Sequence, residues 1–134
     1  MKELVKQLAS QKNNCTYHGY VSNEQKEKLY QQADVLMLPS RGEGFPLVIL
    51  DAMAHGLLVV DSQDIRLDLP EYIEYTSKNN VPEEYIFILN KIYHEKQNAD
   101  FLLHKKRIFD YCVNNLSDTI IFSRLREKIF SHSK

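Results

Sequence analysis

The middle of the chain alternates between apolar runs and polar breaks, as parallel strands joined by a helix do. Residues 33–38 are apolar apart from Asp34, which is typical of a strand covered on both faces. A helix is expected from Pro46 to Gly56, because proline suits a first turn and glycine the left-handed position past the end. Residues 57–60 predict a second buried strand. Strand, loop, helix and strand form a right-handed βαβ unit, so an α/β fold with a small parallel sheet flanked by helices is predicted.

Ahead of this unit the pattern predicts a helix, a strand and another helix. The first helix stops at the polar run 11–14 and gathers its apolar side chains on one face, namely Leu4, Val5 and Leu8. Residues 16–21 favour extended backbone, with Gly19 marking a bulge or a close approach to the main chain. Ser22 and Gln25 form a capping box, which opens a helix running to about residue 32.

Beyond Asp61 the strand pattern fades and helices are expected to dominate. Residues 64–69 form an irregular polar stretch, and a helical turn is expected over 70–74. Three helices follow, with Asn98 and Ser117 as N-caps of the last two, over residues 82–97, 99–114 and 118–130. Helical spacing assigns five side chains of the first of these to the core, namely Tyr85, Phe87, Ile88, Ile92 and Tyr93. The sequence thus predicts a single domain, with a sheet part over about 1–75 and a helical part over about 76–134.

Composition and charge exclude several classes of protein. The 134 residues are 43% apolar, which is enough for a hydrophobic core without disulfides or a structural metal. They carry 17 basic against 18 acidic side chains. This balance argues against a nucleic-acid-binding surface, which needs a surplus of Lys and Arg. The longest apolar run, 47–50, is far shorter than the about 20 residues of a membrane helix. Cys15 and Cys112 are expected to be reduced thiols in a cytoplasmic protein.

Other polar residues offer little chemistry. The five histidines are scattered without metal-ligand spacing, so no metal site is expected from His18, His55, His94, His104 and His132. Ser40 follows Pro39 without the glycine pattern of a nucleophile elbow, which leaves hydrolase chemistry unsupported. The basic run 104–107 is expected to be a solvated helix face, and contact with anionic lipid headgroups is the alternative.

One loop occupies the position where open α/β sheets bind ligands. Such ligands lie beyond the carboxyl ends of the strands, and the loop over residues 41–45 leaves such an end. Gly42 and Gly44, on either side of Glu43, let the backbone approach a ligand closely, and the free N–H groups from Leu47 onward would face a phosphate. The alternative is that these glycines merely form a turn.

Asp51 is the second candidate in this region. Its helix is apolar on almost every side and is therefore expected to be largely buried. A buried carboxylate needs a partner, because an unsatisfied charge is costly away from water. Sugar or ribose hydroxyls would satisfy it. The alternatives are a backbone N–H, a nearby lysine, or exposure on a narrow polar face that includes His55.

Residues 33–60, ADVLMLPSRGEGFPLVILDAMAHGLLVV, closely resemble the signature of the family 4 (group 1) glycosyltransferases, retaining enzymes of the two-domain GT-B fold. The resemblance extends back through residues 19–21 and 29–30. In that family a glutamate, seven intervening residues and a second acidic residue form the donor-sugar motif. The motif maps onto Glu43 and Asp51, with aspartate in place of the usual glutamate.

The resemblance implies transfer of a hexosyl group from a nucleotide-diphosphate sugar to an acceptor sugar, lipid or protein, in a process such as polysaccharide biosynthesis. The nucleotide sugar is a substrate, and no separate cofactor or metal is implied. By the same resemblance Glu43 is the catalytic-site residue that contacts sugar hydroxyls, and Asp51 holds the ribose. The implied donor-binding residues are Glu43, Gly44, Phe45, Pro46, Leu47 and Asp51.

The resemblance also implies a division of labour between two domains. In relatives an acceptor-binding domain and the first strands of the donor-binding domain come before the segment that Met1 begins, together with an Arg and Lys pair that faces the diphosphate. The chain is therefore expected to be the C-terminal, donor-binding part of such a GT-B enzyme and to form a partial Rossmann-like domain. It is expected to be inactive alone, and to work with an N-terminal domain or as a homodimer covering its sheet edge. Two hypotheses remain open beside this one: a degenerate, non-catalytic module of the same fold, and a relative such as a nucleotide-sugar epimerase. The expected location is the cytoplasm, including the inner face of the membrane.

Overall fold

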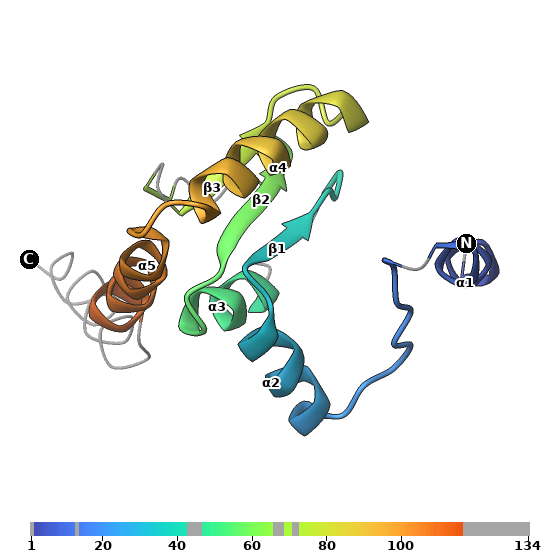
Figure 1. Ribbon diagram of the computed structural model, residues 1–134, viewed down its shortest axis with the longest axis horizontal. Coiled ribbons are helices and arrows are strands. Elements are labelled where there is room, and N and C mark those ends of the chain that lie inside the picture. The colour runs from blue at the N-terminus through green and yellow to red at the C-terminus, as the bar shows by residue number, and fades with distance from the viewer. Residues whose placement is uncertain (1, 13, 43–46, 66–68, 71–72, 117–134) are drawn as a thin grey trace, which may run out of the picture.

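The computed structural model describes residues 2–12, 14–42, 47–65, 69–70 and 73–116 (Figure 1). Its elements are α1 (Lys2–Gln11), α2 (Asn23–Gln32), β1 (Val35–Leu38), α3 (Leu47–Ala54), β2 (Leu58–Ser62), β3 (Glu74–Ser77), α4 (Pro82–Lys96) and α5 (Phe101–Leu116). The helix predicted over 118–130 and its cap Ser117 lie outside the described residues.

The described strands form one parallel sheet in the order β1-β2-β3. Leu36 pairs with Val59, and Val60 pairs with Tyr75. All five residues of β2 are buried, because this central strand has a neighbour on each side and helices over it. The predicted α/β fold and the βαβ unit of β1, α3 and β2 are therefore confirmed.

The strand β3 is a feature that the sequence prediction missed. The Ile73 N–H donates to the Pro70 carbonyl at 2.8 Å, within the stretch expected to form a helical turn, and a strand then begins at Glu74 where none was predicted. With only four residues, Glu-Tyr-Thr-Ser, it lacks the apolar run of β2. Its pairing with β2 stabilises it as a strand, a tertiary contact that the local pattern does not encode.

Two predictions about β1 and the segment before α2 are wrong. The strand β1 is not covered on both faces, because Met37 on one of them is 45% exposed. The strand also lies at the edge of the described sheet. Residues 16–21 do not form a strand; Tyr20 among them is fully exposed. An isolated strand leaves its backbone groups without partners, and no described strand lies beside this segment. Gly19 has φ +67°, the conformation that glycine adopts most readily.

Helices lie on both sides of the sheet. In Figure 1 α4 runs along one side of the strands, whereas α3 and α5 lie on the other and pack against each other. The core between these layers is aliphatic and aromatic, and its buried members include Ile49, Met53, Leu58, Val59, Val60, Ile73, Tyr85, Ile92, Phe101 and Ile108. On α4, Tyr85, Ile88 and Ile92 pack as predicted, but Phe87 and Tyr93 are 73% and 62% exposed because they lie on other faces of the helix.

The helix ends agree well with the local sequence. At the start of α2 the Gln25 N–H donates to the Ser22 hydroxyl and the Ser22 N–H donates back to the Gln25 side chain, which confirms the capping box. Past the end of α3, Gly56 has φ +72°, and its N–H donates to the Met53 carbonyl. The Leu57 N–H donates to the Ala52 carbonyl at 3.0 Å, which completes a Schellman motif.

The helix α1 stands apart from the sheet. Figure 1 draws it at the end of an extended stretch, and Leu4 and Leu8 on its predicted apolar face are half-exposed or more. The prediction of the helix is thus confirmed, but its apolar face covers none of the described core. The helix α5 begins at Phe101, two residues after the predicted start.

Candidate functional site

The predicted site residues divide into two groups. Glu43, Gly44, Phe45 and Pro46 lie outside the described residues. Those that the structure places are Leu47, at the exposed N-terminus of α3, and Asp51, one turn further along the same helix. The described part of the site therefore consists of the two ends of the loop and the groups that hold them.

The loop begins where Pro39 ends β1. The Ser40 N–H donates to the Leu38 carbonyl at 2.9 Å, closing a three-residue turn around Pro39, so the chain leaves the strand ladder here. The Ser40 carbonyl then accepts hydrogen bonds from two side chains, the hydroxyl of Ser62 and, at 3.4 Å, the amide of Asn80. Ser62 ends β2 and is completely buried.

The Ser40 carbonyl belongs to a connected set of hydrogen-bonded polar residues. We call this set the strand-end network: Ser40, Ser62, Ser77, Asn79, Asn80, Glu84 and Tyr85. The Ser77 hydroxyl donates to the Glu84 carboxylate at 2.6 Å and accepts from the Asn80 N–H at 3.0 Å. The backbone N–H of Asn79 and the hydroxyl of Ser77 lower the pKa of Glu84 to about 2. These contacts tie α4 to the carboxyl ends of β2 and β3.

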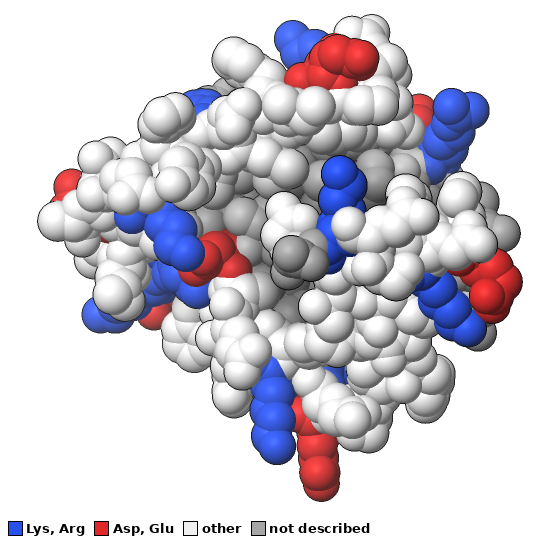
Figure 2. All heavy atoms as spheres, turned by 45° about the vertical axis from the view of Figure 1, so that its right-hand side comes forward, with Lys and Arg blue, Asp and Glu red and all other residues white. Residues whose placement is uncertain are grey.

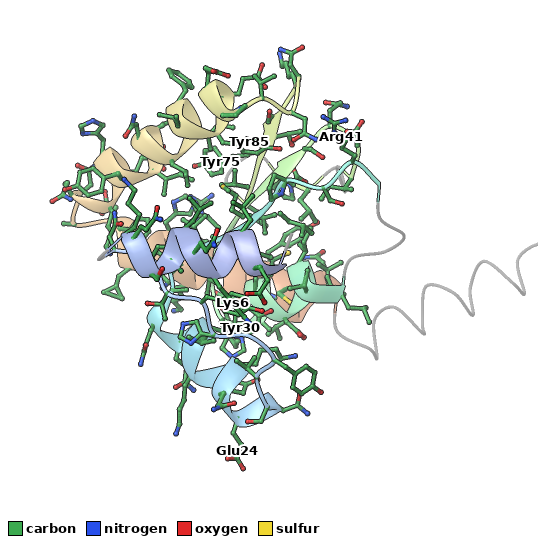
Figure 3. The ribbon with its side chains drawn as sticks, turned by 90° about the vertical axis from the view of Figure 1, so that its right-hand side faces the viewer. Lys6, Glu24, Tyr30, Arg41, Tyr75 and Tyr85 are labelled. Carbon is green, nitrogen blue, oxygen red and sulfur yellow. The ribbon has the colours of Figure 1, made fainter. Side chains whose placement is uncertain are left out.

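A cleft of about 490 Å³ opens beside this network. Polar groups of Arg41, Asn80 and Tyr85 line it together with the apolar Met37, Pro39 and Leu89. Figure 3 shows Arg41 and Tyr85 at the same end of the molecule. The cleft therefore lies at the carboxyl end of β1, where the candidate loop begins.

Asp51 is neither buried nor without a partner. Its Oδ2 lies 2.9 Å from Lys26 Nζ on α2, and the two side chains are 47% and 41% exposed. The expectation that α3 is largely buried holds for the side of Ile49, Ala52 and Met53, but the side that carries Asp51 is open. A nearby lysine is the partner, which was one of the alternatives to a ligand hydroxyl.

A histidine completes what we call the α2–α3 cluster: Lys26, Glu27, Tyr30, Asp51 and His55. His55 Nδ1 lies 2.7 Å from the Asp51 carbonyl, and Nε2 lies 2.7 Å from the Glu27 carboxylate. Because a backbone carbonyl and an ionised carboxylate only accept, the ring makes both bonds together only in its cationic form, in which both nitrogens donate. The hydrogen bond to the Asp51 backbone and the bond to Glu27 raise the pKa of His55. The ring stacks on Tyr30, with centroids 5.1 Å apart.

The basic run 104–107 is not a uniformly solvated face. Lys105 Nζ donates to the Ala33 carbonyl at 3.0 Å and lies 3.2 Å from Asp34, so this lysine ties α5 to the start of β1. Lys96 also pairs with Asp34, at 2.5 Å. Burial would raise the pKa of Asp34, but the hydrogen bonds from Lys96 and Lys105 outweigh it and lower that pKa. The expectation of a solvated face is therefore wrong for Lys105, whereas Lys106 and Arg107 are exposed.

Four general features of the described residues bear on the chemistry. No group of three or more His, Cys, Asp or Glu side chains in the described ranges is arranged to hold a metal ion. The helices that the structure describes are all too short or too polar to span a bilayer. Figure 2 shows Lys and Arg interspersed with Asp and Glu on the face it presents. Cys15 and Cys112 are free thiols.

The sequence prediction missed the strand-end network. Its signals in the sequence are weak. Ser62 merely follows Asp61 at the polar end of an apolar strand. The pair Asn79-Asn80 has the composition of an ordinary turn before a helix. What reveals the network is the parallel register, which brings the ends of β1, β2 and β3 to one edge of the sheet.

Comparison with known proteins supports a specific family. The sequence model described as glycosyl transferases group 1 matches residues 1–86, which include both the α2–α3 cluster and the strand-end network. An uncharacterised 41.2 kDa protein in the cps region of Klebsiella pneumoniae is 36% identical over 63 residues, which make up 47% of this chain and 17% of that protein. An uncharacterised glycosyltransferase of Methanocaldococcus jannaschii is 37% identical over 65 residues, 46% of this chain and 17% of that protein. The similarity thus covers about a sixth of the length of these curated relatives.

Proposed function

The chain belongs to the group 1 glycosyl transferases, and on that premise we propose that it supplies the donor-nucleotide-binding part of an enzyme that transfers a hexosyl group with retention. The donor is a nucleotide-diphosphate sugar, and the acceptor is a sugar, lipid or protein bound by another part of the enzyme. We assign this chain to the C-terminal part of a GT-B architecture, acting in the cytoplasm or at the inner face of the membrane.

One observation supports this proposal most directly. The loop that contains Glu43 joins the carboxyl end of a parallel strand to the N-terminus of α3, and Asp51 lies on the open side of that helix. Ligands of open α/β sheets bind at this position, and the free N–H groups at a helix start attract phosphate. We assign Asp51 to the ribose, because a half-exposed carboxylate that pairs through Oδ2 still has Oδ1 to accept a hydroxyl.

The proposed chemistry requires little of the chain beyond fixed dipoles. Negative charge develops on the β-phosphate as the glycosidic bond breaks, so N–H groups preorganised near Leu47 stabilise the transition state more than the ground state. We assign Glu43 to the sugar hydroxyls, where it orients the donor. No metal ion or cofactor is part of this proposal.

The alternative of a non-catalytic module is favoured by a different observation. Lys26 already occupies one oxygen of Asp51, so a chain that has lost its ligand would retain this ion pair as an ordinary surface contact. The two hypotheses differ in whether the wild-type chain binds a nucleoside diphosphate.

Titration of the ¹⁵N-labelled chain with UDP, ADP and GDP tests the proposal. We expect at least one of these to shift the amides of residues 47–51, and Asp51→Asn to weaken that binding about tenfold, as loss of a charged hydrogen bond does. Glu27→Gln is the matched control, since Glu27 is exposed, lies next to Lys26 and bonds His55 rather than Asp51. No shift with any of the three at millimolar concentration contradicts the proposal.

Replacing Lys26 with Met separates the two hypotheses further. If the site is functional, Oδ1 of Asp51 already serves the ribose, and we expect the dissociation constant to change less than about threefold. If the ion pair blocks a vestigial site, only the Lys26→Met chain binds nucleoside diphosphate. The same titration measures both outcomes.

A further inference from the structure

We propose that Ser62 and Asn80 are positioning residues, which fix the point where the loop carrying Glu43 leaves the sheet. The link to sugar binding rests on the proposed function of that loop. The anchoring itself does not, because it follows from contacts among described residues.

The need for an anchor arises at Pro39. This residue has no N–H to donate to a neighbouring strand, and the Ser40 N–H turns back to the Leu38 carbonyl at 2.9 Å. The backbone ladder between β1 and β2 therefore ends at the pair of Leu38 with Asp61. Side chains then hold the Ser40 carbonyl, the last carbonyl before the loop residues 41–46.

Ser62 is the stronger of the two anchors. Its side chain is fully buried, and its hydroxyl donates to the carbonyl of Ser40, 22 residues earlier in the chain. A buried hydroxyl that loses its acceptor pays the whole cost of desolvation, so this bond is strongly retained. It joins the end of β2 to the exit of β1.

Asn80 is the second anchor and is itself held from two directions. It adopts φ +53°, a conformation that asparagine tolerates better than most residues. Its N–H donates to the Ser77 hydroxyl at 3.0 Å, and its Oδ1 accepts from the Tyr85 hydroxyl at 2.7 Å. These contacts leave Nδ2 to donate to the Ser40 carbonyl, at the longer distance of 3.4 Å.

The two anchors connect the loop to the whole sheet. Ser40 follows β1, Ser62 ends β2 and Ser77, which holds Asn80, ends β3. Glu43 lies only three residues beyond Ser40, so a shift of this carbonyl displaces the start of the loop that carries it. Displacements of about 1 Å are enough to impair a binding or catalytic group.

The test compares Ser62→Ala and Asn80→Asp with Asn79→Ala. The first variant removes the hydroxyl donor; the second removes the amide donor but keeps Oδ1 for Tyr85 and the tolerance for positive φ. Asn79 is the matched control, because its bonds within the same network go to Glu84, on the far side of Ser77 from the loop. If Ser62→Ala fails to fold, Asn80→Asp carries the test alone.

Two measurements are made on each folded variant. The first is the heteronuclear ¹H–¹⁵N NOE of Arg41 and Gly42, compared with that of Val59 in β2. The second is the dissociation constant for the nucleoside diphosphate that the wild-type chain binds. We expect both anchor variants to lower the NOE at Arg41 and Gly42 but not at Val59, and to weaken binding about threefold to tenfold. We expect Asn79→Ala to lower the melting temperature without either change.

The outcomes separate the anchoring from the proposed function. An unchanged NOE at Arg41 and Gly42 in both anchor variants overturns the anchoring, and equal changes in Asn79→Ala show a merely structural network. A looser loop with unchanged affinity overturns the link to the donor. A wild-type chain that binds none of the nucleotides contradicts the proposed function, while the NOE still decides whether Ser62 and Asn80 anchor the loop.

Discussion

The strand-end network and the α2–α3 cluster are both polar and hydrogen-bonded, but the exposure of their central residues to water differs. Ser62 and Ser77 are essentially buried, whereas Lys26 and Asp51 are 41% and 47% exposed. In Figure 3 Tyr85, which belongs to the network, lies in the upper part of the molecule, and Tyr30, which belongs to the cluster, lies in the lower part. At Ser62 and Ser77 no solvent replaces a lost partner, so the bonds of these two hydroxyls fix geometry. In the cluster a ligand hydroxyl competes on nearly equal terms with water and lysine, so its bonds are exchangeable.

Ser77→Ala should show the largest effect and tests whether the network is as strongly held as its burial suggests. The substitution leaves the Asn80 N–H without its acceptor and removes one of the two donors to a Glu84 oxygen, which keeps the Asn79 N–H. We expect a loss of about 2 kcal/mol in the free energy of unfolding, the cost of an unsatisfied N–H together with a lost bond to a charged group. Urea unfolding at an unchanged m-value measures it. Ser10→Ala, which removes an exposed hydroxyl on α1, should change stability by less than about 0.5 kcal/mol.

Glu84→Gln tests the same network through its dependence on pH. The pKa of Glu84 is lowered to about 2, chiefly by the Asn79 N–H, so its ionised form stabilises the folded chain above its ordinary pKa of 4.5. That contribution is lost as the pH falls from 4.5 towards 2. We expect the difference in melting temperature between wild type and Glu84→Gln to shrink over this range. Asp34 also has a lowered pKa, so both chains lose stability in acid, and only their difference reports on Glu84.

A difference that stays constant from pH 6 to pH 2 would contradict the role given to Glu84. It would mean that the ionised and the protonated carboxyl of Glu84 hold Ser77 and Asn79 equally well, and that the charge contributes nothing to the network.

The same contrast explains how much of the fold the sequence could predict. Features that depend only on neighbouring residues in the sequence are predicted well: the capping box at Ser22, the glycine end of α3 at Gly56 and the buried run of β2. Features that depend on a neighbour were not. The strand β3 forms because β2 lies beside it, and residues 16–21 stay irregular because no described strand does.

The candidate site divides in the same way. The candidate donor motif rests on a family resemblance carried by consecutive residues, and the structure places Asp51 on an open face rather than in the core. The partner of Asp51 could not be predicted, because Lys26 lies 25 residues earlier and meets it only through the packing of α2 on α3. Ser62 and Ser40 are likewise brought together by strand register and not by any motif.

His55 offers the smallest and most selective test, because it titrates within the α2–α3 cluster. Its raised pKa means that the cationic ring stabilises the folded chain fully below its ordinary pKa of 6.5, and that this contribution is lost as the pH rises through the higher folded value. The partner Glu27 is half-exposed, so the effect should stay below about 1 kcal/mol. We expect His55→Gln to be less stable than wild type at pH 5.5 and to approach it at pH 9, as measured by urea unfolding. His18→Gln, at an exposed position after α1, controls for the loss of one histidine charge. A deficit that is the same at both pH values would show that His55 acts through its stacking on Tyr30 alone, and the cluster would then be held by packing rather than by exchangeable charge.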